Sequence, residues 1–134
     1  MKFVVISDHS TLGLGYLATA YFSYYANSGV QCSLSTIHQV DDATFQMLER
    51  VLVEDNLLLE KPENLSTEVG DPQVLILIET DQPAAMAVQS APRVYYVRPE
   101  QPDPGLSEPD RYRQYREEIK REILRIIGKE ELVR

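Results

Sequence analysis

The stretch FVVISDHSTLGLGYLATAYFSYY, residues 3–25, decides the fold of this chain. Residues 3–6 form a continuous apolar run of β-branched and aromatic side chains, which is typical of a strand buried on both faces. From Leu14 to Tyr25, apolar side chains recur at helical spacing until Asn27-Ser28-Gly29 ends the pattern. A polar loop separates the two elements. We expect this strand to be the central one of its sheet.

Three further strands are expected, at residues 31–37, 74–78 and 94–97. The second of these is the most strongly apolar segment of the chain, which again favours cover on both faces. Strands that alternate with helices predict an α/β fold with right-handed crossovers and a mainly parallel sheet. In such sheets ligands bind at the carboxyl ends of the strands, where the loop after residues 3–6 lies.

Helices are expected between and after these strands. Asp41-Asp42 can cap a helix that carries Phe45, Leu48, Val51 and Leu52 on one face. A short helix is expected over residues 84–88. Ser107 and Asp110 resemble a capping box, and the terminal helix that follows should end near Gly128. Two loops complete the chain: a polar one at residues 62–71, and a proline-rich one from Pro99 to Pro109 that must be either ordered by a neighbour or mobile.

Length and composition limit the classes of function. The 134 residues, 43% hydrophobic and 25% charged, fit a single globular domain over residues 1–134. A net charge of −8 argues against nucleic acid, whose binding depends on Lys and Arg, but a small anion can still be held by backbone N–H groups. The apolar run after Met1 is too short for a signal peptide or a membrane span, and Cys32 is the only cysteine. We therefore expect a cytoplasmic protein.

The motifs that could indicate a cofactor or a metal are weak. Gly13 to Ala18 matches G-x-G-x-x-A, but Leu12 and the polar stretch separate it from the strand, so we expect its glycines to let a wide loop turn into the helix. No Gly-Lys-Ser/Thr occurs, which excludes a Walker A loop. His9 and His38 show no zinc-ligand spacing and are expected to be solvated. Cys32 lacks a basic neighbour, so we expect an inert thiol, no cofactor and no metal.

Several local patterns resemble the low-molecular-weight protein tyrosine phosphatases and the arsenate reductases that share their fold. Residues 43–48 are similar to the second helix of that family, and residues 57–65 to the segment that leads into its third strand. Pro102-Asp103-Pro104-Gly105, followed by residues 112–119, is similar to its Asp-Pro loop and terminal helix, which is the most specific match. The resemblance covers nearly the whole chain. It implies a three-layer fold with a four-stranded sheet of order 2-1-3-4 and helices on both faces.

The resemblance also implies where chemistry would take place. In the family, the loop after the first strand reads Cys, five residues, Arg, then Ser or Thr. The thiolate attacks phosphorus or arsenic, while the arginine and backbone N–H groups hold the oxyanion. In the phosphatases, the aspartate of the Asp-Pro loop protonates the leaving group. The matching aspartate here is Asp103, although an Asp between prolines is also ordinary turn chemistry.

The present sequence departs from the family at the nucleophile. That position falls at Ser7 or Asp8, and the arginine position falls at Gly13 or Leu14. No Cys-x5-Arg occurs, because the sixth residue after Cys32 is a histidine. A serine would need an activating base, and none is evident, so thiolate-type catalysis should be lost.

Three hypotheses follow from the sequence. The first is a catalytically silent relative that binds an oxyanion or a phosphorylated ligand at the loop. The second is an atypical phosphatase with Asp8 or Ser7 as nucleophile and Asp103 as acid. The third is a scaffold that binds a protein partner, or a second copy of itself, through surface tyrosines. The candidate ligand-binding loop consists of Asp8, His9, Ser10, Thr11, Leu12, Gly13, Leu14 and Gly15.

Overall fold

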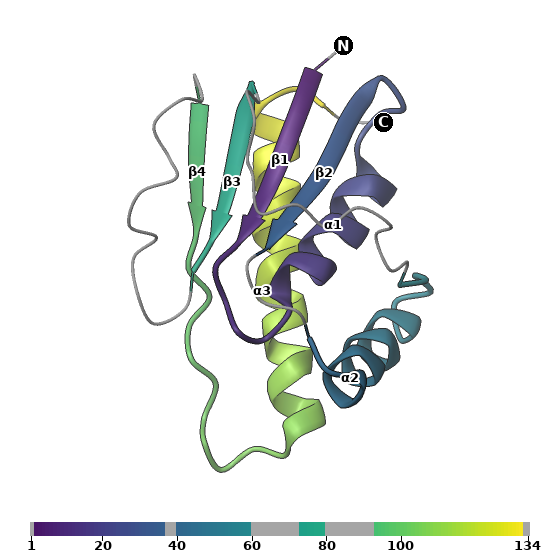
Figure 1. Ribbon diagram of the computed structural model, residues 1–134, viewed down its shortest axis with the longest axis vertical. Helices are drawn as coiled ribbons and strands as arrows, with labels where there is room; N and C mark the ends of the chain where they lie inside the picture. Colours follow the sequence, from purple (N-terminus) through teal and green to yellow (C-terminus); the bar gives the residue numbers. More distant parts are fainter. Residues whose placement is uncertain (1, 37–39, 60–72, 80–92, 133–134) are drawn as a thin grey trace.

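The computed structural model describes residues 2–36, 40–59, 73–79 and 93–132 of the chain. The strands are β1 (Lys2–Asp8), β2 (Val30–Thr36), β3 (Val74–Ile78) and β4 (Arg93–Val97). The helices are α1 (Leu14–Tyr25), α2 (Asp42–Val53) and α3 (Glu108–Lys129). The strands form one parallel sheet of order β2-β1-β3-β4, with β1 in the interior (Figure 1). The predicted sheet is confirmed, whereas the expected helix at residues 84–88 and the loop at 62–71 lie outside the described residues.

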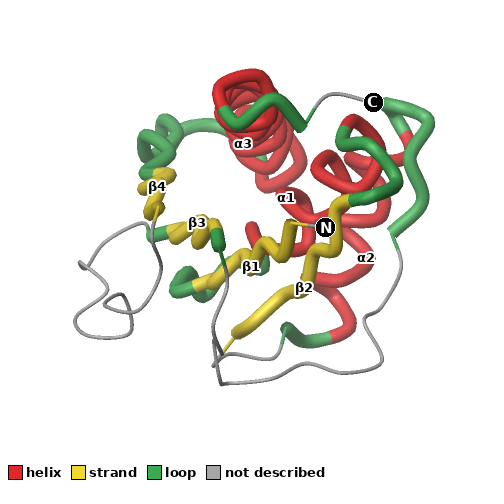
Figure 2. Tube along the Cα trace, turned by 90° about the horizontal axis from the view of Figure 1, so that it is seen from above, coloured by secondary structure: helices red, strands yellow, loops and turns green. Residues whose placement is uncertain are grey.

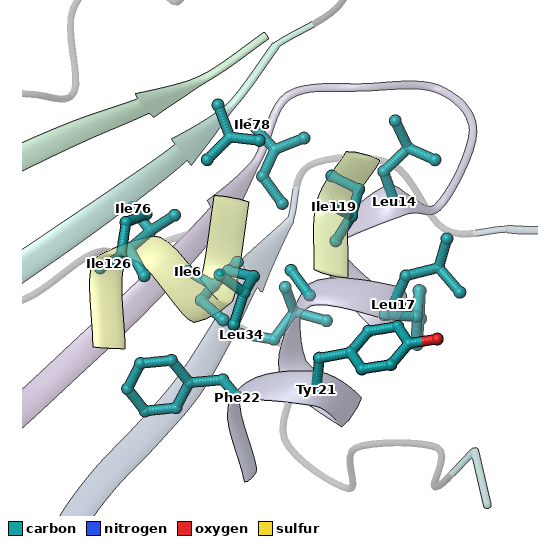
Figure 3. Close-up of a cluster of buried hydrophobic side chains, with 14 of the residues drawn as sticks. Ile6, Leu14, Leu17, Tyr21, Phe22, Leu34, Ile76, Ile78, Ile119 and Ile126 are labelled. Atoms are coloured by element: carbon teal, nitrogen blue, oxygen red, sulfur yellow. The ribbon is translucent and has the colours of Figure 1, made fainter. Parts of the chain in front are cut away.

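The described helices pack against one face of the sheet, as Figure 2 shows. Alternate strand residues, among them Val4, Ile6 and Ile76, meet the apolar stripes of all three helices in one buried cluster. Figure 3 shows Ile126 of α3 close to Ile76 of β3, and Ile119 of α3 close to Leu14 and Leu17 of α1. Because α3 contacts α1, α2 and β4, it ties the helical layer together.

The opposite face of the sheet is buried as well. Val5, Leu75 and Leu77 are no more than 1% exposed and form a second cluster, to which the described helices contribute no residue. All five residues of β3 are buried. The unbroken apolar character of residues 3–6 and 74–78 therefore has the cause that the sequence predicted, which is burial on both faces.

The strand and helix ends differ from the prediction in one respect that matters for the site. β1 continues through Ser7 and Asp8, which the sequence pattern places in the loop. Both residues pair in parallel register with β2 on one side and β3 on the other, so backbone pairing overrides the polar side chains. The helix starts are as expected: Asp41 caps α2 by accepting from Thr44 N at 2.7 Å, and Ser107 caps α3 by accepting from Asp110 N at 3.4 Å.

Candidate functional site at the carboxyl end of the sheet

The loop after β1 is organised around the carboxylate of Asp8. In Asp8, Oδ1 accepts hydrogen bonds from the Ser10 backbone N–H at 2.9 Å and from the Ser10 hydroxyl at 2.7 Å. Its other oxygen, Oδ2, accepts from Gly15 N in the first turn of α1 at 3.0 Å. Asp8 is only 2% exposed. The carboxylate therefore joins the two ends of the loop through these hydrogen bonds.

Ser10 provides a second, weaker centre inside the loop. Its hydroxyl oxygen lies 3.4 Å from the backbone N–H groups of both Leu12 and Leu14, while its proton is donated to Asp8. Ser10 is 1% exposed. The N–H groups of Ser10, Leu12, Leu14 and Gly15 are thus directed at the side chains of Asp8 and Ser10.

The two glycines of the loop allow its backbone conformation. Gly13, the residue before α1, has φ 75°, a left-handed conformation that favours glycine. A Cβ on Gly15 would lie 2.6 Å from Asp8 Cβ and 2.7 Å from Leu34 Cδ1, so only glycine lets the helix approach the carboxylate this closely. This geometry agrees with the expectation that the glycines let a wide loop turn into the helix.

Ser7 and Asp8 lie on opposite faces of the sheet. Asp8 follows Val4 and Ile6 on the face that the described helices cover, whereas Ser7 follows Val5 on the other face. The Ser7 hydroxyl is 2.9 Å from His9 Nε2, so His9 pairs with Ser7 and does not relay protons between Asp8 and Ser10. Its ring is partly buried, in contrast to the solvated loop residue that the sequence suggested. Of the two nucleophile candidates, only Asp8 faces the loop.

Burial dominates the electrostatics of Asp8. It raises the pKa of the carboxyl above its ordinary value, and the hydrogen bonds from Ser10 and Gly15 oppose this shift only in part. The raised pKa favours the protonated carboxyl, which is not a nucleophile, and the hydrogen bonds to both oxygens reduce the reactivity of the ionised form. Any anion that entered the loop would also meet this buried charge at close range.

A cavity of about 370 Å³ lies beside the loop, between it and the segment that leads from β4 into α3. Figure 1 shows this segment running along the carboxyl end of the sheet to the start of α3. The loop, the segment and the helix all contribute to the lining, which consists of Thr11, Leu12, Gln101, Pro102, Pro104, Glu108, Arg111, Tyr112 and Tyr115. The Tyr112 hydroxyl donates to the Leu12 carbonyl at 3.2 Å and thereby joins α3 to the loop. The proline-rich segment is therefore a wall of the cavity.

Asp103 is close to this cavity in the chain but does not line it. Its side chain is exposed, and Oδ1 accepts from Gly105 N at 2.8 Å, which is an ordinary Asx turn. The prolines on either side of it do line the cavity. Of the candidate residues, Thr11 and Leu12 therefore line the cavity. Asp8 is hydrogen-bonded within the loop, and the carboxylate of Asp103 is hydrogen-bonded within its own turn.

The remaining candidate residues lie elsewhere. Cys32 is in β2, where burial raises the pKa of its thiol to about 12, so it is not a reactive thiolate. His38 is outside the described residues. Within the described part of the chain, no group of three or more His, Cys, Asp or Glu side chains is arranged to hold a metal ion. None of the helices described there combines the length and apolar character needed to cross a membrane.

Sequence reasoning did not identify Glu108 and Arg111 as cavity residues. Both belong to a helix expected from its apolar stripe and cap, and nothing in the local sequence indicates what faces them. The hydrogen bond that closes this part of the cavity joins residues 100 positions apart in the chain. The available signal was indirect: Glu108, Arg111, Tyr112 and Tyr115 share one helical face, at spacings i, i+3, i+4 and i+7.

Comparison with known proteins shows similarity of fold. No family model matches the chain, and no curated protein sequence matches it. An arsenate reductase from Archaeoglobus fulgidus superposes with a TM-score of 0.66 at 16% identity, covering 93% of this chain and 98% of the reductase. The YwlE arginine phosphatase from Geobacillus stearothermophilus gives a TM-score of 0.69 at 14% identity, covering 98% of this chain and 94% of the phosphatase. An arsenate reductase in the phosphate-binding state gives 0.69 at 13% identity. The chain therefore has the three-dimensional fold of these enzymes.

Proposed function

We propose that this chain is a catalytically silent relative of the phosphatases and arsenate reductases that have this fold, and that Asp8 takes the place of the oxyanion in its loop. One observation carries the proposal. Three donors of the loop and of the first turn of α1, namely the N–H and hydroxyl of Ser10 and the N–H of Gly15, bind the carboxylate of Asp8. A carboxyl group attached to the chain thus supplies the acceptor oxygens that a bound oxyanion would otherwise supply.

The chemistry of the loop supports this proposal. Residues 7–15 contain neither cysteine nor arginine, so the loop has no thiolate to attack and no guanidinium to hold a tetrahedral oxyanion. The single cysteine is in β2 and has a raised pKa. If an oxyanion displaced Asp8 from these donors, the buried carboxylate would lose its hydrogen bonds. That loss costs free energy. The oxyanion-binding part of our first hypothesis is therefore the less favoured part.

An atypical phosphatase is less well supported by the geometry. Ser7 faces away from the loop, and both oxygens of Asp8 already accept hydrogen bonds. Asp103 would have to act as the acid, but its carboxylate is held in a surface turn by Gly105 N. This mechanism would need both carboxylates to rotate before any substrate could react.

A turnover assay tests the proposal. The purified chain should show no hydrolysis of an aryl phosphate or of phosphoarginine, and no thiol-dependent reduction of arsenate, above the rate without protein. The variants Asp8→Ala and Asp103→Ala serve as matched controls against contaminating enzymes. Turnover by the wild type that disappears in Asp8→Ala would overturn the proposal and establish Asp8 as a catalytic residue. Turnover that persists equally in both variants would come from a contaminant, and would leave the chain itself silent as proposed.

A further inference from the structure

The cavity beside the loop contains an unpaired set of opposite charges. Glu108 and Arg111 both line it, three residues apart on α3. On the same helix, the i,i+3 pairs Asp110–Arg113 and Glu122–Arg125 close into salt bridges of 2.7 and 2.8 Å. No salt bridge forms between Glu108 and Arg111, although the structure describes both. The two residues thus line the cavity without forming an ion pair with each other.

The rest of the lining combines ring and proline surfaces with the polar side chains of Thr11 and Gln101. Tyr112 and Tyr115, each 7% exposed, form an edge-to-face pair with ring centroids 6.2 Å apart, and Pro102 and Pro104 also line the cavity. Flat rings and proline surfaces of this kind accommodate an apolar group. The volume of about 370 Å³ is at the small end of the range for ligand cavities. It suits a small molecule and not a folded partner.

We propose that this cavity binds a zwitterionic small molecule with an apolar body, of the class of α-amino acids with a large apolar side chain. Arg111 binds the carboxylate of the ligand, Glu108 binds its ammonium group, and the tyrosine and proline surfaces hold its side chain. The lining carries one positive and one negative charge, so the ligand with matching charge has no net charge. A net charge of −8 on the chain disfavours ligands that carry only an anionic group.

The site is separate from the Asp8 loop. Its cation and its anion both come from α3, and the loop contributes only Thr11 and Leu12. It therefore does not depend on whether Asp8 has replaced a bound oxyanion. Binding of an amino acid and binding of phosphate are distinguishable in experiment, because they involve different residues.

Chemical-shift mapping of the ¹⁵N-labelled chain tests this inference. L-phenylalanine and L-leucine at millimolar concentration should shift the backbone amides of Thr11, Leu12 and Gln101. Two compounds dissect the charges: 3-phenylpropanoate lacks the ammonium group, and phenethylamine lacks the carboxylate. Both should bind at least about tenfold more weakly than L-phenylalanine, because each leaves one charged side chain of the cavity without its partner.

Variants identify the residues responsible. Arg111→Gln should weaken L-phenylalanine at least about tenfold and leave phenethylamine unchanged, and Glu108→Gln should weaken L-phenylalanine and leave 3-phenylpropanoate unchanged. Arg125→Gln, the same change on an outer part of α3, should have no effect. The inference is overturned if neither amino acid shifts these amides. It is also overturned if Arg111→Gln binds L-phenylalanine as wild type does, or if 3-phenylpropanoate binds as tightly as the amino acid.

Discussion

Asp8 is buried, and three hydrogen-bond donors are directed at its carboxylate. The burial and the hydrogen bonds have opposite effects on the stability of its ionised form. Burial raises its pKa, whereas the hydrogen bonds from Ser10 and Gly15 favour the ionised form. The raised pKa means that burial is the larger effect. The carboxyl group therefore stabilises the fold most in its protonated form, and ionisation costs part of that stability.

We expect Asp8→Ala to lower the free energy of unfolding by about 1–3 kcal/mol, because buried N–H groups lose their acceptor. The loss should depend on pH. Since the pKa of Asp8 in the folded chain lies above its ordinary value of 3.8, the stabilising contribution is complete below that value. It decreases as the pH rises through the folded pKa. Urea denaturation of both proteins from acid to neutral pH measures this, and a difference that grows with pH would contradict it.

Two glycines give opposite predictions for the same substitution. Gly15→Ala should destabilise the chain by about 1–3 kcal/mol, because its Cβ would lie 2.6 Å from Asp8 Cβ. Gly128→Ala, near the end of α3, meets no atom within 4 Å and should stabilise by about 0.4–1 kcal/mol through the lower entropy of the unfolded chain. Thermal unfolding of both variants tests the pair. Equal effects would show that the close approach at Gly15 does not constrain the loop.

At the scale of single residues, the sequence predicted where a candidate residue lies in the chain better than which way its side chain points. It placed Asp8 at the nucleophile position and proposed Ser7 as an equal alternative. Successive side chains of β1 point to opposite faces of the sheet, which separates Ser7 from Asp8. The sequence did not predict this, because it placed both residues in the loop, whereas pairing with β2 and β3 extends the strand to Asp8. Asp103 does lie in a turn between two prolines, but the direction of its carboxylate depends on that turn, and its role as an acid stays a prediction.

At the scale of elements, charged side chains connect the end of α2 to α3. Glu54 accepts hydrogen bonds from Arg113 at 2.8 Å and from Arg116 at 2.6 Å, and Arg116 also donates to the Val51 carbonyl. Next to them, Tyr21 of α1 donates to Asp55 at 2.5 Å. All three described helices therefore meet in one polar junction at the edge of the apolar core.

The pH dependence of this junction is predicted to come chiefly from Glu54. Hydrogen bonds from Arg113, and next from Arg116, lower the pKa of Glu54 from 4.5 to about 2. A lowered pKa gives stability that is present above the ordinary value and is lost as the pH falls towards about 2. The stability difference between wild type and Glu54→Gln should therefore be complete near neutral pH and decrease under acid conditions.

The matched control is Glu49→Gln, at an exposed position of the same helix. It should change stability less than Glu54→Gln at neutral pH, as expected for a surface charge. Urea denaturation at several pH values measures both variants. If the difference between wild type and Glu54→Gln stayed constant down to low pH, the ion pairs with Arg113 and Arg116 would not be the cause.

Elements were the easiest level to predict from the sequence. The apolar runs and the two capping residues, Asp41 and Ser107, each act through neighbours close in the chain, so local pattern was enough. The cavity could not be predicted in the same way. Its walls come from a loop near residue 12 and a helix near residue 112, and only the fold brings them together.

At the scale of the whole molecule, the chain keeps the architecture of known phosphatases and arsenate reductases while its loop lacks their reactive groups. The parallel sheet places the loop after β1 and the segment after β4 at the same edge. In this position the chain has a filled loop beside an open cavity. Our proposals therefore place a ligand site at the start of α3 and not in the loop.

The central claim is that Asp8 fills the space of an oxyanion, and phosphate binding by wild type and Asp8→Ala tests it most directly. Isothermal titration and thermal unfolding with inorganic phosphate should show no binding to the wild type. Asp8→Ala, whose loop donors are released, should bind phosphate and melt several degrees higher when phosphate is far above its dissociation constant. Phosphate binding by the wild type at equal or greater strength than by Asp8→Ala would contradict the claim.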